Sequence, residues 1–261
     1  MTEQDDGVLD IWQAALSVAV SYGLATLYFA VLQVLCPQVG GRAMGVTAQL
    51  LSYGTIIAFL MSRGGIGYRR LLHDTRTPAR TVAAYLLVPV LLVAGGGAFV
   101  AADVVNMLET LLPMSDGNRA LFASMLDGSP EALAATLAVA PWAEEMLFRG
   151  LILRGLLKYY QPGPAIFLSA LLFALAHLNV YQGCVAMLVG LVCGWMYWRT
   201  RTLLPCVLAH FTFNAVAMFY DPAPLREAGS RALQAATSYT ALAAVLIGLG
   251  LLYRILERRK V

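Results

Sequence analysis

An all-α, polytopic transmembrane helical bundle is the fold class that this sequence predicts, and three observations support the prediction. Hydrophobic residues make up 59% of the 261 residues and charged residues only 13%, a composition that is rare among soluble globular domains. Apolar runs of about 20 residues, the helical length that crosses a hydrocarbon core, recur along the chain. Basic residues also gather in alternate connecting segments, as the positive-inside rule requires of a protein with many spans.

The apolar runs predict about eight spans. They cover residues 11–35, 43–62, 81–102, 131–160, 163–178, 180–198, 203–220 and 235–256.

The distribution of polar residues divides these spans into three regions. Residues 1–130 hold about three spans with few polar side chains and are predicted to form an N-terminal scaffold. Residues 131–220 hold spans four to seven and carry most of the intramembrane polar groups. Residues 221–261 supply a last span and a basic tail.

Charge asymmetry predicts the orientation. If the N-terminus is cytoplasmic, 14 of the 18 Lys and Arg residues fall on the cytoplasmic face. Only Arg42, Arg119, Arg226 and Arg231 then lie on the opposite face. We therefore expect both termini in the cytoplasm. The acidic start of the chain lacks the basic region of a signal peptide, so no cleavable signal is expected.

Ionisable groups inside hydrocarbon cost at least about 2.5–3.5 kcal/mol each, so those within spans are candidates for function. The candidates are Glu144, Glu145, Arg149, His177, His210 and Asn214. The four cysteines lack the spacing of a metal site and are predicted to be small buried residues. No basic aromatic surface suggests binding to nucleic acid.

Helix geometry separates the two glutamates. Glu145 and Arg149 are four residues apart and share a helix face, whereas Glu144 is rotated by about 100°. This spacing predicts a Glu145–Arg149 ion pair and leaves Glu144 available for chemistry. The alternative is that both carboxylates lie at a membrane boundary among lipid headgroups.

Two histidines extend the pattern. The Pro162-Gly163-Pro164 turn predicts a helical hairpin in which Glu144 and His177 lie at about the same depth. His210 and Asn214 are four residues apart and share a face of the seventh span. Taken alone, each histidine could instead be a core residue, and the His210/Asn214 pair a hydrogen-bonded clamp between helices.

The motifs Glu144-Glu145-xxx-Arg149, Phe173-xxx-His177 and His210-xxx-Asn214, in this order on successive apolar segments, resemble the CPBP family of intramembrane proteases. That family includes CAAX prenyl endopeptidases and bacteriocin-processing proteins. The resemblance covers roughly residues 130–220. It implies that spans four to seven form the catalytic core of an endopeptidase acting on a membrane-associated protein or peptide.

The resemblance also implies a role for each residue. Glu144 and His177 would activate a water, His210 and Asn214 would stabilise the oxyanion or complete the water site, and Glu145 with Arg149 would support them. Glu144, His177 and His210 are also a possible ligand set for a divalent metal such as zinc, and the sequence leaves this choice open.

Other functions stay open at this stage. A non-catalytic membrane immunity or binding protein, or a proton-coupled carrier, could use the same polar cluster. The substrate could be a prenylated CAAX tail, a leader peptide or a transmembrane sorting signal. The Ala-, Leu-, Arg- and Gly-rich composition is typical of a bacterium, which suggests the inner membrane as the location.

Overall fold

The computed structural model describes residues 9–220 and 231–258, and its regular structure there is helical apart from an isolated β-bridge between His73 and Thr202. The elements are α1 (Ile11–Leu35), α2 (Gly41–Arg63), α3 (Tyr68–Leu72), α4 (Ala79–Leu111), α5 (Asp116–Met125), α6 (Pro130–Leu133), η1 (Ala134–Val139), α7 (Ala140–Glu145), η2 (Met146–Leu153), α8 (Arg154–Tyr159), α9 (Pro162–Leu175), α10 (Val180–Thr200), α11 (Leu204–Phe219) and α13 (Arg231–Arg258).

The all-helical class is confirmed within the described residues, and each predicted span coincides with helical structure. Five helices there are long and apolar enough to cross a membrane: α1, α2, α4, α10 and most of α13. Helices α9 and α11 are apolar but shorter; the 14 residues of α9 rise only about 21 Å. Five candidate spans are therefore found, and the count of eight stays a prediction.

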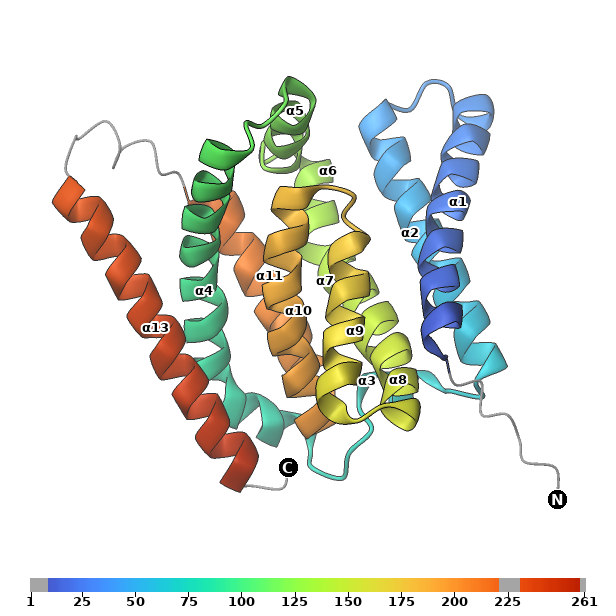
Figure 1. Cartoon of the computed structure of the whole chain (residues 1–261). Helices are drawn as coiled ribbons and strands as arrows, with labels where there is room; N and C mark the ends of the chain where they lie inside the picture. Colours follow the sequence, from blue (N-terminus) through green and yellow to red (C-terminus); the bar gives the residue numbers. More distant parts are fainter. Residues whose placement is uncertain (1–8, 221–230, 259–261) are drawn as a thin grey trace, which may run out of the picture.

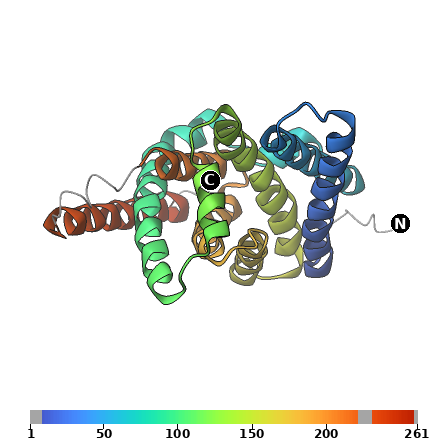
Figure 2. The ribbon, with the colours of Figure 1, turned by 90° about the horizontal axis from the view of Figure 1, so that it is seen from above.

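The helices form a bundle with a central core and two flanking layers (Figures 1 and 2). Helix α13 packs along α4 on one side, and the α1–α2 hairpin covers the opposite side. The first contact is close because Gly96 has no side chain: an added Cβ would lie 2.7 Å from the Ala241 carbonyl oxygen. Helices α9, α10, α11 and the chain from α6 to α8 lie between these layers.

The chain from Pro130 to Tyr159 is continuously helical and winds as a π-helix in two segments. The wider π-helical segments η1 and η2 flank α7, the six-residue α-helical segment that carries Glu144 and Glu145. Pro141 lies in the first turn of α7. A proline ring clashes with the preceding turn of an α-helix and removes one donor, so the wide turn of η1 accommodates it. Short π segments in helices often mark functional sites.

Small residues determine how tightly α10 packs on α9. A Cβ added to Gly190 would lie 2.8 Å from the Ala170 Cβ, and one added to Gly194 would lie 2.9 Å from the Ile166 Cγ2. The sequence motif Gly190-xxx-Gly194 predicts this close approach of two helices. Close packing here fixes α9 and α10 as a rigid wall beside the polar core.

The two ends of the bundle carry different charges. The start of α1, the ends of α2, α8, α10 and α13, and helix α3 lie at one end in Figure 1, and most of the basic loop residues belong to these segments. Arg149, one of the 14 residues assigned to this face, is instead buried in the core. The predicted connection at 221–230 with Arg226, residues 1–8 and the last three residues of the basic tail lie outside the described ranges.

At the opposite end, Asp127 precedes α6 and pairs with Arg42 of α2. Hydrogen bonds from the Ser129 backbone N–H and hydroxyl, together with Arg42, lower the pKa of Asp127 from 3.8 to about 2. Ser129 also caps α6, because its hydroxyl accepts from the Ala132 N–H. This polar cluster fixes the entry of the chain into the segment that carries the glutamates.

Candidate active site

Glu145 is the buried centre of a polar cluster. Its side chain has no exposed surface, and its Oε1 lies 3.0 Å from Arg149 Nη1 and 3.0 Å from His210 Nδ1. The first contact is the i,i+4 pair that the sequence spacing predicts. The second joins α7 to α11 through a histidine. These contacts bring together three of the predicted site residues, Glu145, Arg149 and His210.

Arg149 is enclosed by aromatic and small residues. Its side chain is 1% exposed, and its Cζ lies 4.5 Å from the centre of the Phe173 ring, the geometry of a cation–π contact. Gly190 lies beside it, since a Cβ added there would be in ordinary van der Waals contact with Arg149 Nη2, at 3.5 Å. The ion pair with Glu145 is the charge compensation that a buried guanidinium requires.

Glu144 points to a different environment from its neighbour. Its side chain is 15% exposed, and its Oε1 accepts a hydrogen bond of 3.3 Å from the hydroxyl of Tyr53 on α2. Its buried Oε2 has no hydrogen-bond partner among the described residues and lies 3.9 Å from His210 Nε2. This separation exceeds a direct hydrogen bond but suits a bridging water or substrate oxygen.

His210 is thus shared between the two glutamates, whereas His177 lies beside them. Helix α9 ends at Leu175, so His177 lies just past the helix, and its Nδ1 is 2.8 Å from the carbonyl oxygen of Phe173. The Phe173 ring separates the two histidines, with its centre 4.9 Å from that of His177 and 6.0 Å from that of His210. No direct bond between His177 and Glu144 is found in this part of the structure.

Asn214 closes the site on the side of η1. Its Nδ2 donates a hydrogen bond of 2.8 Å to the carbonyl oxygen of Thr136 in η1. The contact clamps α11 to the wide turn that precedes α7. An asparagine side chain has two N–H donors and one acceptor, so this contact leaves further hydrogen-bonding capacity for a substrate.

The described residues offer one group of three potential metal ligands close together, and it differs from the predicted set. The ligand atoms of Glu145, Cys193 and Cys206 lie within 4.8 Å of one another, and all three residues are buried. Both thiols already donate to carbonyls, Cys206 Sγ to Cys193 O at 3.2 Å and Cys193 Sγ to Cys206 O at 3.9 Å. The Arg149 cation beside Glu145 also opposes a divalent cation, so the group fits a metal poorly.

Tyr53 is the site residue that the sequence analysis missed, because the first three spans were assigned to the scaffold. A tyrosine in the middle of an apolar helix is a detectable signal, since its hydroxyl needs a partner in hydrocarbon. Its partner could not be found from the sequence, because α2 and α7 are far apart in the chain.

One segment of the chain is similar to a known protein family. Residues 129–216 match the family described as type II CAAX prenyl endopeptidase Rce1-like. This segment, about a third of the chain, is similar to the CAAX protease family. The matched segment contains Glu144, Glu145, Arg149, His177, His210 and Asn214. No curated protein and no solved structure matches the chain.

The similarity of residues 129–216 to this family supports an enzyme of the protease class. The candidate spans support an integral membrane protein, and CAAX proteases act on membrane-associated proteins. Tyr53 lies on α2, outside the matched segment, so one contact to Glu144 comes from a part of the chain to which the family match does not extend.

Proposed function

We propose that this protein is an intramembrane endopeptidase that hydrolyses a peptide bond of a membrane-associated protein or peptide, with Glu144 as general base. The observation that carries the proposal is the unpartnered carboxylate oxygen of Glu144 beside His210. Glu144 Oε2 is buried, lacks a partner among the described residues and faces His210 Nε2 at 3.9 Å. A water placed there would contact a carboxylate and an imidazole at once.

In the proposed reaction, Glu144 removes a proton from this water while the water oxygen attacks the peptide carbonyl carbon. Glu144 then passes the proton to the leaving amine as the C–N bond breaks, so the carboxylate is regenerated. A positioned base typically accelerates such a step by about 10²–10⁴-fold. Tyr53 holds the other carboxylate oxygen and so fixes the direction in which Oε2 points.

His210 is proposed to stabilise the oxyanion. Two carboxylates and one guanidinium leave the cluster with a net negative charge, which a protonated His210 would balance. Its Nδ1–H would donate to Glu145 at 3.0 Å, and its Nε2–H would face the water site. Donors held in place in a dry site stabilise developing negative charge strongly. We propose that Asn214 contributes its second N–H, and that His177 binds the substrate or a second water.

Two arguments bear on the remaining alternatives. The Arg149–Glu145 ion pair disfavours a metal at the Glu145, Cys193 and Cys206 group. A metal held by Glu144, His177 and His210 stays an alternative, and no step of the proposed reaction passes through a metal. A non-catalytic immunity or binding protein, or a proton-coupled carrier, would not require a water site between Glu144 and His210. The family match also favours proteolysis over these alternatives.

The decisive experiment compares membrane fractions of cells carrying the wild-type protein or Glu144→Gln by mass spectrometry. The substitution keeps the side-chain shape and removes the base, so we expect an uncleaved precursor to accumulate. Glu131→Gln in α6, on the same composite helix but outside the site, is the matched control and should process normally. Normal processing by Glu144→Gln would refute the assignment of the base. The sequence of the precursor would distinguish a prenylated CAAX tail, a leader peptide and a transmembrane sorting signal.

A further inference from the structure

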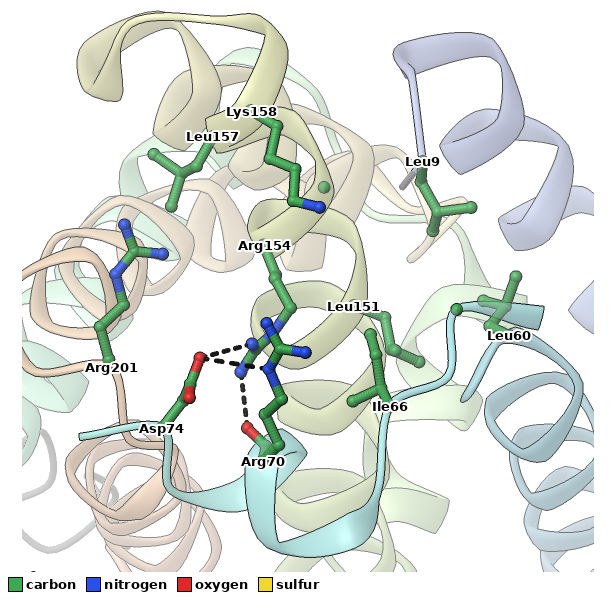
Figure 3. Close-up of a pocket in the computed structure, with 12 residues that line it drawn as sticks. Leu9, Leu60, Ile66, Arg70, Asp74, Leu151, Arg154, Leu157, Lys158 and Arg201 are labelled. Carbon is green, nitrogen blue, oxygen red and sulfur yellow. Dashed lines mark hydrogen bonds and ion pairs between the residues drawn. The ribbon is translucent and has the colours of Figure 1, made fainter. Parts of the chain in front are cut away.

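A cavity of about 220 Å³ lies at the basic end of the bundle, and Figure 3 shows the residues that line it. It is formed where the start of α1, the end of α2, the α2–α3 loop, α8 and the end of α10 meet. None of the six predicted site residues lines it. Arg154 on its wall is ten residues beyond Glu144, about 15 Å along the helix. The cavity is therefore separate from the candidate active site.

The charged residues of the cavity carry an excess of positive charge. Among the described lining residues, Arg70, Arg154 and Arg201 surround one carboxylate, that of Asp74, and Lys158 also contributes to the wall. Arg154 Nη1 binds Asp74 at 2.7 Å, and Arg70 lies farther from the same carboxylate, at 3.9 Å. The Asp74 carboxylate cannot neutralise the three arginines, so this described part of the lining attracts an anion.

The position of Arg154 is fixed by its own hydrogen bonds. Its Nε donates to the Gly150 carbonyl oxygen at 3.0 Å, and its Nη2 donates to the Arg70 carbonyl oxygen at 2.6 Å. Its side chain is only 11% exposed. Arg201 ends α10 in the left-handed conformation, with φ of 52°. The Arg201 carbonyl oxygen accepts a hydrogen bond of 2.8 Å from the Asp74 N–H. The backbone therefore holds these basic residues around the cavity before any ligand arrives.

The other half of the lining is apolar. Leu9, Leu60, Ile66, Leu151 and Leu157 contribute to the wall. Leu9 approaches closely because Gly155 has no side chain: a Cβ there would lie 2.7 Å from the Leu9 carbonyl oxygen. A ligand that fits this lining has an anionic head and an apolar body.

The level of the cavity in the bundle identifies the kind of anion. Gly64 caps α2 and Arg201 caps α10, and both helices are candidate membrane spans. The cavity therefore lies where two spans end, at the depth of lipid headgroups. Basic pockets between helices at such a level are suited to the phosphates of anionic lipids. The C-terminal carboxylate of a bound substrate is a poorer candidate, because an extended three-residue tail reaches only about 10 Å.

We propose that this cavity binds the phosphate headgroup of an anionic phospholipid, with the glycerol and first acyl carbons against its leucine-lined wall. The bound lipid bridges α2, α3, α8 and α10, and so fastens the N-terminal half of the bundle to the segment that carries the glutamates. The proposal does not depend on the protein being a protease.

The test is native mass spectrometry of the full-length protein in a mild detergent doped with phosphatidylglycerol, phosphatidylcholine or inorganic phosphate. We expect retention of phosphatidylglycerol and not of phosphatidylcholine. The double variant Arg70→Gln/Arg201→Asn should weaken retention by about 25-fold, since each basic side chain near a headgroup contributes about fivefold. Asparagine is chosen at 201 because it tolerates the left-handed conformation.

Two further variants keep the result interpretable. Arg76→Gln/Arg80→Gln removes the same charge from exposed residues of the same end of the bundle but outside the cavity, and should retain the lipid. Arg70→Lys/Arg201→Lys preserves the charge and should also retain it. The proposal would be overturned if Arg76→Gln/Arg80→Gln lost phosphatidylglycerol to the same extent as Arg70→Gln/Arg201→Asn. It would also be overturned if the wild-type protein retained phosphatidylcholine as well as phosphatidylglycerol. Occupancy by inorganic phosphate alone at the same level as the lipid would overturn the lipid assignment.

Discussion

Removing the guanidinium of Arg149 should destabilise the protein through the carboxylate it leaves behind. In Arg149→Met, Glu145 would stay fully buried with His210 as its nearest possible charge partner, at 3.0 Å. Breaking a buried ion pair by removing one partner costs about 3–5 kcal/mol. The loss of the cation–π contact with Phe173 adds about 0.5–2 kcal/mol. In Glu145→Leu the unpaired charge is the guanidinium itself, which is 1% exposed, so a cost in the same range is expected.

The double variant Glu145→Leu/Arg149→Met removes both charges and should recover much of this loss. His210 Nδ1 would lose its acceptor, which costs about 1–3 kcal/mol. The coupling energy between the two positions should therefore be at least about 3 kcal/mol. Reversible unfolding in mixed micelles of mild detergent and dodecyl sulfate measures all four proteins without requiring activity.

The pair between Arg199 and Glu257 is a matched control. Its atoms are 2.9 Å apart, but the side chains are 20% and 38% exposed. The corresponding cycle with Arg199→Met and Glu257→Leu should give a coupling of about 1 kcal/mol or less. Additivity within about 0.5 kcal/mol at Glu145 and Arg149 would show that burial does not make this pair stronger than a surface pair, and would refute the reasoning.

Substitutions at four residues and treatment with one reagent allow further tests. Tyr53→Phe should lower kcat/KM by about tenfold, the loss of one hydrogen bond to a carboxylate, while the unfolding midpoint changes little; full activity would show that the contact is not used. Chelators should leave turnover unchanged. If a chelator abolished turnover and added zinc recovered it, the reaction would depend on a metal. Hydrogen bonds from Ser129 lower the pKa of Asp127 to about 2, so its stabilising contribution is complete above pH 3.8 and lost as the pH falls through about 2. The difference in unfolding midpoint between wild type and Asp127→Asn should disappear over that range, and a constant difference would contradict it. A single cysteine replacing Arg201 should react only from the cytoplasm and one replacing Arg119 only from outside; the reverse result would invert the orientation.

The helices were predictable because apolar length and the proline–glycine turn are local signals. The Glu145–Arg149 contact was predictable for the same reason, since it lies within one helix. The histidine that lies near Glu144 was harder to predict. The hairpin geometry indicated His177, whereas the structure places His210 Nε2 3.9 Å from Glu144 Oε2. The hairpin estimate treats both helices as straight α-helices that include the histidine. Helix α9 ends before His177, and the chain that precedes α9 winds in part as a π-helix. The similar predicted depth of Glu144 and His177 therefore does not bring them into a direct bond.

The sequence pattern could not predict contacts between distant parts of the chain. Tyr53 reaches Glu144 from another hairpin, and Cys193 meets Cys206 across two helices. A periodic pattern shows which face of a helix is buried but not which helix covers it. The cavity at the basic end was also not predicted, because it depends on where five separate segments end.

The two π-helical segments on either side of α7 determine where this part of the chain can change its length. A wide turn holds one residue more than the α-helical turn it replaces, so deleting a single residue from 134–139 would let the helix wind normally. The later side chains would keep their direction relative to α11, because the residue removed is the extra one of the wide turn. The α-helical segment α7 has no extra residue, so a deletion there would rotate every later side chain on the helix by about 100°. Among descendants of this sequence, we expect single-residue deletions at 134–139 but not at 140–145, while the loop at 112–115 varies in length.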